Sequence, residues 1–316
     1  MEADKCNCEV PQQDKIMGTN HSYVSPLRYP GGKSKISNFM EDILLLNNLE
    51  NCTLYELYAG GAGASLTLLL SGVCNKIVLN DLDYHIYAFW HCVLYYTTEL
   101  VKLINESEVN IKNWLIQRDI YENIKEHSIL EVGFSAFFLN RANRSGILYK
   151  AGPIGGQDQT GTYKIDVRYN KTDLVNRIVR IAQLKDNIEI HNTESIDFLQ
   201  MIFAKDSGNK FIFLDPPYYK QGENLYLNFY KDADHVRLRD ILYANKNTSW
   251  LLTYDNCERI NELYHDFRKG HSVMSYTLQE KRKSKEVMIF SDNLYLPKQF
   301  RTVSKQLKFD LVGQEN

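Results

Sequence analysis

The 316-residue sequence has no long hydrophobic run, which argues against a membrane-spanning segment. Its longest apolar stretch, residues 64–73, is short and is interrupted by serine, threonine and glycine. The amino terminus carries acidic residues where a secretory signal needs basic residues followed by an apolar segment. We therefore expect a cytoplasmic protein that is neither exported nor inserted in a membrane.

The sequence also lacks the cysteine spacing of a metal or redox centre. Its 6 cysteines are scattered, and none forms a CxxC pair. Cys6 and Cys8 are separated by one residue, but they lie in a polar stretch that favours ordinary free thiols. We expect reduced thiols and no metal site.

A general excess of positive charge is missing as well, since the formal net charge is −2. Two segments nevertheless depart from this average. Residues 133–180 contain eight basic residues against three acidic ones, and residues 281–285 read Lys-Arg-Lys-Ser-Lys. A charged run taken alone is most often a solvated face, so a nucleic-acid interface needs support from other features.

The sequence does contain alternating strand and helix patterns, with 44% hydrophobic residues to build a large core. Residues 53–58 are typical of a strand, residues 60–63 of a tight turn, residues 64–70 of a helix and residues 76–80 of a second strand. This βαβ unit predicts an α/β fold with a parallel sheet. Further strands are expected at residues 188–191, 211–214, 250–254, 271–277 and 286–292, with a helix near residues 232–244.

Residues 84–180 interrupt this alternation and predict an insertion in the sheet domain. The pattern is helical from Tyr84 to about Phe138, whereas residues 140–161 are rich in Gly, Asn, Arg and Gln and predict a hairpin or long loop. The sheet offers a place for a small molecule. The basic loop of the insertion offers one for something acidic.

A glycine-rich turn and an acidic residue predict a nucleoside site. Gly61 and Gly63 follow the first strand, and Asp81 follows the second strand 18 residues later. Glycines let the backbone approach a ligand, and an acid at this offset accepts hydrogen bonds from ribose hydroxyls. The same spacing also fits a nicotinamide dinucleotide, so the identity of the cofactor stays open on these residues alone.

The stretch Asp215-Pro216-Pro217-Tyr218 ends an apolar strand with an unusual set of groups. Proline has no N–H, so the local backbone offers carbonyl acceptors beside the Asp215 carboxylate. These acceptors can take both hydrogens of an exocyclic amine on a nucleobase, which localises the nitrogen lone pair for attack. Tyr218 can supply a flat face on which an extruded base stacks. The alternative is a structural Asp-Pro turn.

Four motifs in order give the chain a family resemblance. Tyr29-Pro30-Gly31-Gly32-Lys33, Glu56-Leu57-Tyr58-Ala59-Gly60-Gly61-Ala62-Gly63, Asn80-Asp81 and Asp215-Pro216-Pro217-Tyr218 resemble the signatures of the Dam-like DNA adenine-N6 methyltransferases. Asn140-Arg141 followed by Ser145-Gly146 is similar to that family's DNA-contacting hairpin. Two departures are Glu56-Leu57-Tyr58, where the family usually has Glu-Pro-Phe or Asp-Pro-Phe, and the divergent hairpin.

The resemblance implies a Rossmann-like methyltransferase sheet that uses S-adenosylmethionine to methylate the N6 amine of a flipped adenine in double-stranded DNA. The implied cofactor-binding residues are Tyr29, Gly31, Gly32, Lys33, Glu56, Tyr58, Gly60, Gly61, Gly63, Asp81 and Asp215. The implied catalytic residues are Asp215, Pro216, Pro217 and Tyr218. The predicted DNA-binding residues are Arg141, Arg144, Lys281, Arg282 and Lys283, where the two loop arginines suit base edges and the basic run suits phosphates.

The same resemblance divides the chain into four parts. Residues 25–83 and 181–298 are expected to form the catalytic domain and residues 84–180 the target-recognition insertion, with a polar extension at 1–24 and a polar tail at 299–316. A cognate restriction endonuclease would then be a partner. The rival interpretations are an NAD-dependent oxidoreductase, which leaves Asp-Pro-Pro-Tyr unexplained, and a non-catalytic nucleic-acid-binding module. An RNA substrate also fits the amine chemistry.

Overall fold

The computed structural model describes residues 24–28, 36–205, 208–219, 230–275, 283–297, 299–301, 306–308 and 310–312. Within these ranges the main feature is an eight-stranded sheet. Its strands are β1 (Thr53–Glu56), β2 (Lys76–Asn80), β3 (Ile188–His191), β4 (Lys210–Leu214), β5 (Trp250–Asp255), β6 (Arg268–Ser275), β7 (Lys283–Phe290) and β10 (Asp310–Val312).

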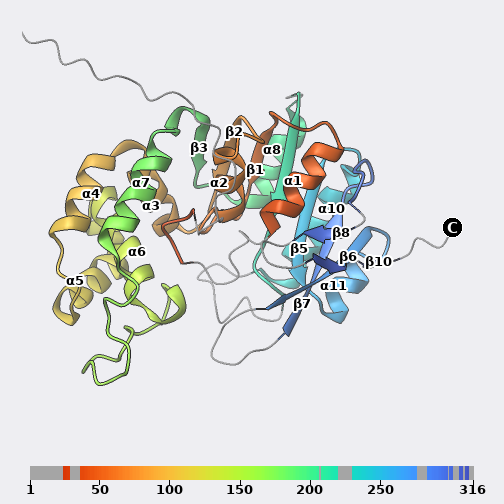
Figure 1. Ribbon diagram of the computed structural model, residues 1–316. Coiled ribbons are helices and arrows are strands. Elements are labelled where there is room, and N and C mark those ends of the chain that lie inside the picture. Colours follow the sequence, from red (N-terminus) through yellow and green to blue (C-terminus); the bar gives the residue numbers. More distant parts are fainter. Residues whose placement is uncertain are drawn as a thin grey trace, which may run out of the picture.

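The sheet is parallel in one half and antiparallel in the other. Across the sheet the strands follow the order β10-β6-β7-β5-β4-β1-β2-β3 (Figure 1). Strands β1 to β5 pair in parallel, whereas β7 is antiparallel to both β5 and β6, and β10 is antiparallel to β6. The chain therefore has the predicted mixed α/β fold in which parallel pairing dominates.

Both faces of the sheet are buried, which explains the unbroken apolar run of β4. Phe211 and Phe213 join one core cluster, and Ile212 and Leu214 join the other, because successive side chains of a strand point to opposite faces. The first cluster is completed by α1 (Ser37–Leu46), α2 (Gly63–Leu70) and the helices of the insertion, and the second by α8 (Ser195–Ala204), α10 (Asp232–Ala244) and α11 (Glu258–Leu263).

The segment between β2 and β3 forms a lobe of five α-helices beside the sheet, at the left of Figure 1. Its helices are α3 (Tyr84–Tyr95), α4 (Thr97–Glu106), α5 (Ile111–Glu122), α6 (Ile129–Ala142) and α7 (Lys171–Ala182), with the 3-10 turns η2 (Ile124–Glu126) and η3 (Arg144–Gly146), and η4 (Lys185–Asn187) leads back to β3. Gly133 lets α6 approach α3, since a Cβ there would lie 2.7 Å from the Ala88 carbonyl.

Local signals place the ends of these helices. Side-chain oxygens of Asp83, Asn110 and Asn170 accept backbone N–H groups at the starts of α3, α5 and α7. Ser128 and Glu131 form a capping box at the start of α6. The predicted loop after α6 is present as η3 and a chain that returns to form an isolated antiparallel bridge between Asn143 and Pro153.

The carboxyl-terminal part differs from the expected polar tail. Residues 299–316 contain β8 (Gln299–Arg301), which pairs with β9 (Gln306–Lys308), and also β10, which extends the main sheet beside β6. Strands this short are specified by the edge they pair with, so their own residues carry little pattern. In the described ranges no helix is long and apolar enough to cross a membrane.

The order of the parallel strands changes direction at β1. From β1 the chain moves outward to β2 and β3, and it then crosses to β4 and β5 on the other side of β1. In open α/β sheets, ligands bind beyond the carboxyl ends of the strands at such a reversal of direction. The reversal lies between β1 and β4, where Glu56 is paired with Phe213 and Asp215 follows two residues later.

Candidate functional site

Acidic side chains gather along the edge of the sheet where the parallel strands end. Glu56 is the last residue of β1, Asp81 follows β2 and Asp215 follows β4. Asp255 ends β5 and is directly opposite Glu286 of the antiparallel β7. The sequence predicted the first three carboxylates as site residues, and the topology brings two more to the same edge.

The glycine-rich turn is held against Asp81. The Gly60 N–H donates to Asp81 Oδ2 at 2.8 Å, and the Asp83 N–H donates to Asp81 Oδ1 at 2.9 Å. Gly60 has a φ of +45°, which glycine adopts without strain, and its carbonyl accepts from Trp90 Nε1 of the helical lobe at 2.9 Å. The turn ends at Gly63, the first residue of α2.

Asn80, the last residue of β2, fixes the position of residues 81–83, which we call the acidic loop. Its side chain is fully buried and donates to the Leu57 and Thr193 carbonyls and to Ser195 Oγ, while its Oδ1 accepts from the Thr193 N–H. Loss of a buried group with so many partners would leave several of them without a hydrogen bond. Asn80 thus ties the ends of β1 and β2 to the start of α8.

Glu56 and Asp81 are carboxylates whose protonated forms are favoured. Burial raises the pKa of Glu56 to about 8, against the effect of Ser65 on α2, and the nearby Asp215 and Asp81 carboxylates add to the increase. Burial likewise raises the pKa of Asp81 to about 7, and Asp83 contributes to this increase. Among the described residues, Glu56 Oε2 has no hydrogen-bond partner. The site therefore favours a ligand that brings positive charge or hydrogen-bond donors.

Tyr58 belongs to a part-buried hydrogen-bond chain. Its hydroxyl lies 2.7 Å from that of Tyr230, which donates to Glu194 Oε1 at 3.4 Å. The other Glu194 oxygen accepts the Ile196 and Asp197 N–H groups at the start of α8. Burial raises the pKa of the Tyr58 hydroxyl well above its usual value, so it stays neutral.

The Asp215-Pro216-Pro217-Tyr218 segment is attached to β5 and β7 at three points. Thr253 Oγ1 donates to Asp215 Oδ1 at 2.5 Å, and the Tyr219 N–H donates to Asp255 Oδ1 at 2.9 Å. The Tyr218 hydroxyl donates to Glu286 Oε1. The backbone carbonyls and the half-buried Tyr218 ring are therefore held in a defined arrangement.

The two predicted loop arginines lie in different surroundings. Arg141 is half-buried, and its guanidinium donates to the Arg168 carbonyl at 2.7 Å and to the Pro26 carbonyl at 3.5 Å. Arg144, in η3, is exposed. Next to Arg141, the Asn140 side chain accepts the Arg28 N–H at 2.6 Å and donates to the Arg28 carbonyl at 2.8 Å.

Several predicted site residues lie outside the described residues. They are Tyr29, Gly31, Gly32 and Lys33 of the first motif, and Lys281 and Arg282 of the basic run. Lys283 is the first residue of β7, but its side chain is not described. Their assignments stay predictions.

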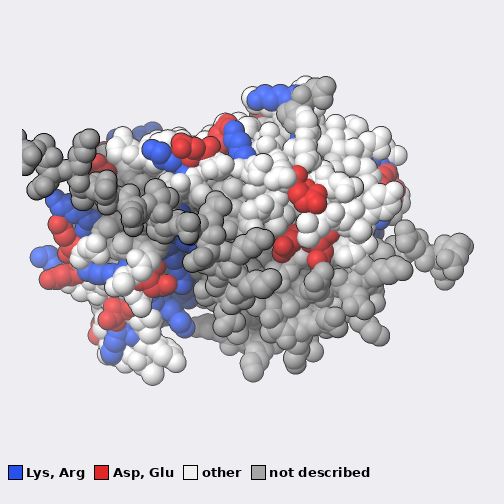
Figure 2. Space-filling view, turned by 45° about the horizontal axis from the view of Figure 1, so that its top comes forward, with Lys and Arg blue, Asp and Glu red and all other residues white. Residues whose placement is uncertain are grey.

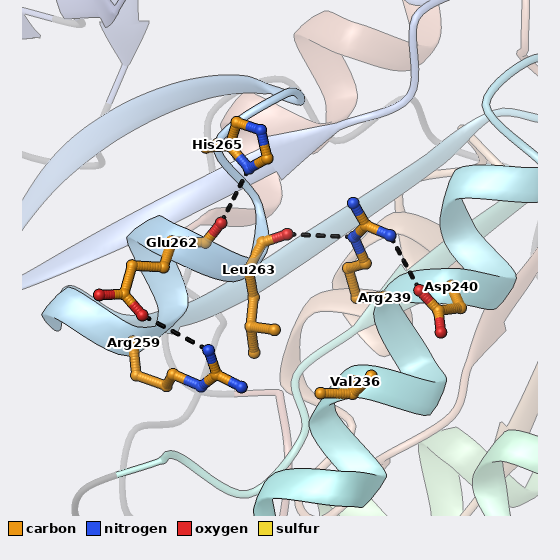
Figure 3. Close-up of a pocket in the computed structure, with 7 residues that line it drawn as sticks. All are labelled: Val236, Arg239, Asp240, Arg259, Glu262, Leu263 and His265. Atoms are coloured by element: carbon orange, nitrogen blue, oxygen red, sulfur yellow. Dashed lines mark hydrogen bonds and ion pairs between the residues drawn. The ribbon is translucent and has the colours of Figure 1, made fainter.

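A small cavity lies apart from the strand-end site, by which we mean Glu56, Asp81 and the Asp215-Pro216-Pro217-Tyr218 segment. It measures about 170 Å³ and is lined by Val236, Arg239, Asp240, Arg259, Glu262, Leu263 and His265 (Figure 3). Its charged groups pair with each other, since Arg239 contacts Asp240 at 2.9 Å and Arg259 contacts Glu262 at 3.4 Å. Across the part of the chain that the structure describes, no group of three or more His, Cys, Asp or Glu side chains is arranged to hold a metal ion.

Sequence reasoning missed Thr253, Asp255 and Glu286, which support the Asp215-Pro216-Pro217-Tyr218 segment and Tyr219. Glu286 is fully buried, and Asp255 and Thr253 are also buried. The available signal was a polar or acidic residue inside an otherwise apolar strand, as in Trp250–Asp255. Such a residue is costly to bury unless it has a partner, so it marks a hydrogen-bonded position.

Comparison with known proteins identifies one family over most of the chain. Residues 29–282 match the family described as D12 class N6 adenine-specific DNA methyltransferase. The modification methylase StsI of Streptococcus sanguinis is 22% identical over 249 residues, which is 74% of this chain and 35% of that protein. The chain thus spans about a third of the length of this curated relative.

Solved structures are more distant. The rRNA methyltransferase aviRa of Streptomyces viridochromogenes is 11% identical with a TM-score of 0.36, covering 89% of this chain and 95% of that one. A Haemophilus influenzae protein proposed to be a methylase is 11% identical with a TM-score of 0.31, covering 81% of this chain and 98% of that one. Similarity at this level carries no argument about function, so the family match carries the assignment.

The raised pKa of Glu56 predicts a pH-dependent effect of Glu56→Gln. A carboxyl whose folded pKa lies above its unfolded value stabilises the fold fully below about pH 4.5 and loses this contribution as pH rises through about 8. Glutamine does not titrate, so the variant should gain stability relative to the unmodified protein between pH 6 and pH 9, by about 1–3 kcal/mol.

Thermal unfolding of both proteins across this range measures the difference. Glu106→Gln, at an exposed position at the end of α4, serves as the control and should follow the unmodified protein at every pH. If the stability of Glu56→Gln and of the unmodified protein changed equally with pH, the pKa of Glu56 would not be raised in the folded protein.

Proposed function

Because this chain belongs to the D12 class N6 adenine-specific DNA methyltransferase family, we propose that it transfers a methyl group from S-adenosylmethionine to the N6 amine of an adenine extruded from double-stranded DNA. The observation that carries this proposal is the convergence of Glu56, Asp81 and the Asp215 segment at the reversal point of the sheet. The nucleoside cofactor and the extruded adenine would meet there.

The residues of the strand-end site fit S-adenosylmethionine. This molecule supplies an electrophilic methyl group on a positively charged sulfur, and it also carries an ammonium group and a ribose with two hydroxyls. The buried Glu56 oxygen without a partner suits a positively charged or donating group. Asp81, whose oxygens each accept one backbone N–H, retains lone pairs for ribose hydroxyls. Tyr29, Gly31, Gly32 and Lys33 would complete the site, and so would Gly61 and Gly63 of the turn.

Asp215 would prepare the amine for attack. Its carboxylate is oriented by Thr253, and Pro216 and Pro217 add no competing N–H groups to the neighbouring backbone. With one amine hydrogen bonded to the carboxylate and one to the Pro216 carbonyl, the nitrogen lone pair would leave the plane of the base. Attack on the methyl group would break its bond to sulfur and release S-adenosylhomocysteine, and Asp215, already bonded to the amine, would accept the proton that the methylated amine loses.

Tyr218 would hold the extruded base. Its ring packs against the core beside α10, and its hydroxyl is bound to Glu286, so the orientation of the ring is fixed before the base arrives. Stacking on an aromatic ring contributes about 1–3 kcal/mol per base. A ring that is already oriented loses little entropy on binding, which strengthens this contribution.

The helical lobe offers positive charge for the DNA backbone. Figure 2 shows Lys and Arg side chains along the inner side of this lobe, where it borders the rest of the molecule. The pKa of Arg141 is lowered to about 10, mainly by burial and also by the neighbouring Arg28, Arg177 and Arg168, against the opposing effect of Asp173. Positive charge thus exceeds negative charge around Arg141, which favours a phosphate over a neutral ligand.

The proposal of a partner endonuclease rests on similarity alone. StsI is called a modification methylase, and by analogy a cognate restriction endonuclease would be a partner of this chain. A DNA substrate agrees with the cytoplasmic location that the sequence predicts.

Asp215→Ala should abolish methyl transfer without unfolding the protein, because it removes an acceptor at the end of β4 rather than a core side chain. The single-turnover rate with labelled S-adenosylmethionine and DNA should fall by at least about 10²-fold. Digestion of the product should give N6-methyladenine with the unmodified protein. Asp240→Asn, an exposed acid on α10, is the control and should keep full activity. A rate within a few-fold of the unmodified protein for Asp215→Ala would reject the proposed role, and label in cytosine or in RNA alone would reject the substrate.

Alanine variants of Arg168 and Arg144 should distinguish general affinity for DNA from recognition of its sequence. Arg168→Ala removes an exposed cation near Arg141 but keeps the carbonyl that Arg141 contacts, so it should weaken binding to all duplexes alike and reduce the salt slope by about one. Arg144→Ala should cost about 1–3 kcal/mol on the cognate site and relax discrimination at one base pair.

Fluorescence anisotropy with cognate and scrambled duplexes at several salt concentrations measures both effects. Arg237→Ala, a surface arginine paired with Asp197 on the sheet domain, should change neither quantity. If Arg144→Ala weakens both duplexes equally, Arg144 contacts phosphate and the base-reading residues lie elsewhere in the insertion. The contacts proposed for Lys281, Arg282 and Lys283 belong to the phosphate class by the same reasoning.

A further inference from the structure

Trp90 of the helical lobe contacts the glycine turn, residues 60–63, directly. Its indole Nε1 donates to the Gly60 carbonyl oxygen at 2.9 Å. The side chain is 2% exposed, and its ring packs edge-on against Phe89, with centroids 4.9 Å apart. Phe89 in turn stacks on Phe137 of α6, with centroids 5.8 Å apart. The indole is therefore held by the core of the lobe, and its N–H points at a fixed acceptor.

The bond from Trp90 orients the peptide unit between Gly60 and Gly61. This unit is trans, and a trans peptide directs its C=O and its N–H to opposite sides. Because the carbonyl faces Trp90, the Gly61 N–H points away from it. Glycine adopts positive and negative φ about equally, so a peptide with glycine on both sides rotates with little steric cost. Steric constraints alone therefore do not select one orientation of this unit.

The peptide units before and after it are held by other bonds. The Gly60 N–H, in the preceding unit, donates to Asp81 Oδ2 at 2.8 Å. The Ala62 N–H, in the following unit, donates to the Ala59 carbonyl at 2.5 Å. Rotation of a single peptide unit between two fixed neighbours is the local change that remains. The bond from the indole acts on that unit.

We propose that Trp90 is a positioning residue of the cofactor site, whose indole N–H selects the orientation of the Gly60–Gly61 peptide that binds S-adenosylmethionine. In glycine-rich turns the backbone closely approaches a bound nucleoside cofactor, so the direction of each N–H decides which ligand atoms it meets. In the observed orientation the Gly61 N–H is offered to an acceptor of the cofactor, whereas in the rotated one the Gly60 carbonyl would take its place. This inference rests on the proposed function, since it takes the glycine turn to contact the cofactor.

The test compares three variants that each lose one buried indole N–H. Trp90→Phe loses the bond to the turn, Trp114→Phe loses a bond of 2.7 Å to Asn143 Oδ1, and Trp250→Phe loses a bond of 3.1 Å to the Asn245 carbonyl. In calorimetric titration, Trp90→Phe should bind S-adenosylhomocysteine about fivefold more weakly than the unmodified protein, the factor that corresponds to one hydrogen bond. Its stoichiometry should be unchanged, which shows that it is folded. The other two variants should bind within about twofold of the unmodified protein, and an equal loss in all three would overturn the proposal.

A second replacement separates the hydrogen bond from packing. Phenylalanine is smaller than tryptophan, so Trp90→Phe also leaves a gap in the core. Benzothienylalanine at position 90, in which sulfur replaces the indole N–H, keeps the bicyclic shape and removes the donor. It should bind S-adenosylhomocysteine as weakly as Trp90→Phe does. Binding equal to that of the unmodified protein would show that the volume of the ring matters and not its N–H, and would overturn the proposal.

Steady-state kinetics with DNA distinguish a positioning role from a general loss of structure. Trp90→Phe should raise the KM for S-adenosylmethionine by about fivefold, while kcat at saturating cofactor stays within about twofold, because bound cofactor then holds the turn in the binding orientation. A lower kcat with an unchanged KM would mean that fewer molecules are active, and this result would contradict the positioning role.

Binding by the unmodified protein separates this inference from the proposed function. If the unmodified protein binds S-adenosylhomocysteine and Trp90→Phe binds it equally well, Trp90 has no role in the cofactor site, and the proposed function is unaffected. If the unmodified protein binds neither S-adenosylhomocysteine nor S-adenosylmethionine, the proposed function is wrong, and this inference fails with it.

Discussion

The structure depends most on the cost of burying carboxylates at the ends of parallel strands. Both faces of the sheet are covered, so the edge between β1 and β4 is where polar groups can meet a ligand. Glu56, Asp81 and Asp215 converge there, and burial together with repulsion from neighbouring carboxylates disfavours the ionised forms of Glu56 and Asp81. The proposed cofactor, a positively charged nucleoside, would relieve this cost through both its charge and its hydroxyl groups.

The helical lobe is joined to this edge by specific contacts. Trp90 donates to the Gly60 carbonyl in the glycine turn, His85 connects Asp83 to Tyr121, and Asn140 binds both polar groups of the Arg28 backbone. Two of these three contacts involve the turn or the acidic loop that would hold the cofactor. The lobe proposed to contact DNA is therefore joined by direct contacts to the segments proposed to hold the methyl donor.

Local patterns were sufficient to predict the strands that carry the site. Strands β2 and β3 and the helix α10 were predicted with their observed bounds, because each segment carries its periodicity in its own residues. The strand pairing in the antiparallel half of the sheet was harder to predict from local patterns. The insertion of β7 between β5 and β6, and the addition of β10 at the edge, depend on pairing between distant segments that no local pattern encodes.

The site shows the same division. Asp81 and Asp215 were predicted because each follows a strand directly, but Glu286 became a neighbour of Tyr218 only through the register that sets it opposite Asp255. The guanidinium of Arg141 likewise contacts Pro26, 115 residues away in sequence, which a loop pattern cannot predict. Sequence spacing located the reacting groups, whereas the residues that orient them required the fold.

The most direct test of this account is the number of protons exchanged when S-adenosylmethionine binds. Calorimetry at pH 7.5 in buffers of different ionisation enthalpy gives this number. If Glu56 and Asp81 titrate near pH 8 and pH 7 and face a cationic ligand, binding should release protons at pH 7.5, and the release should shrink towards zero at about pH 10. Binding without proton release at pH 7.5, or with proton uptake, would contradict the claim that buried carboxylates at the strand ends form the cofactor site.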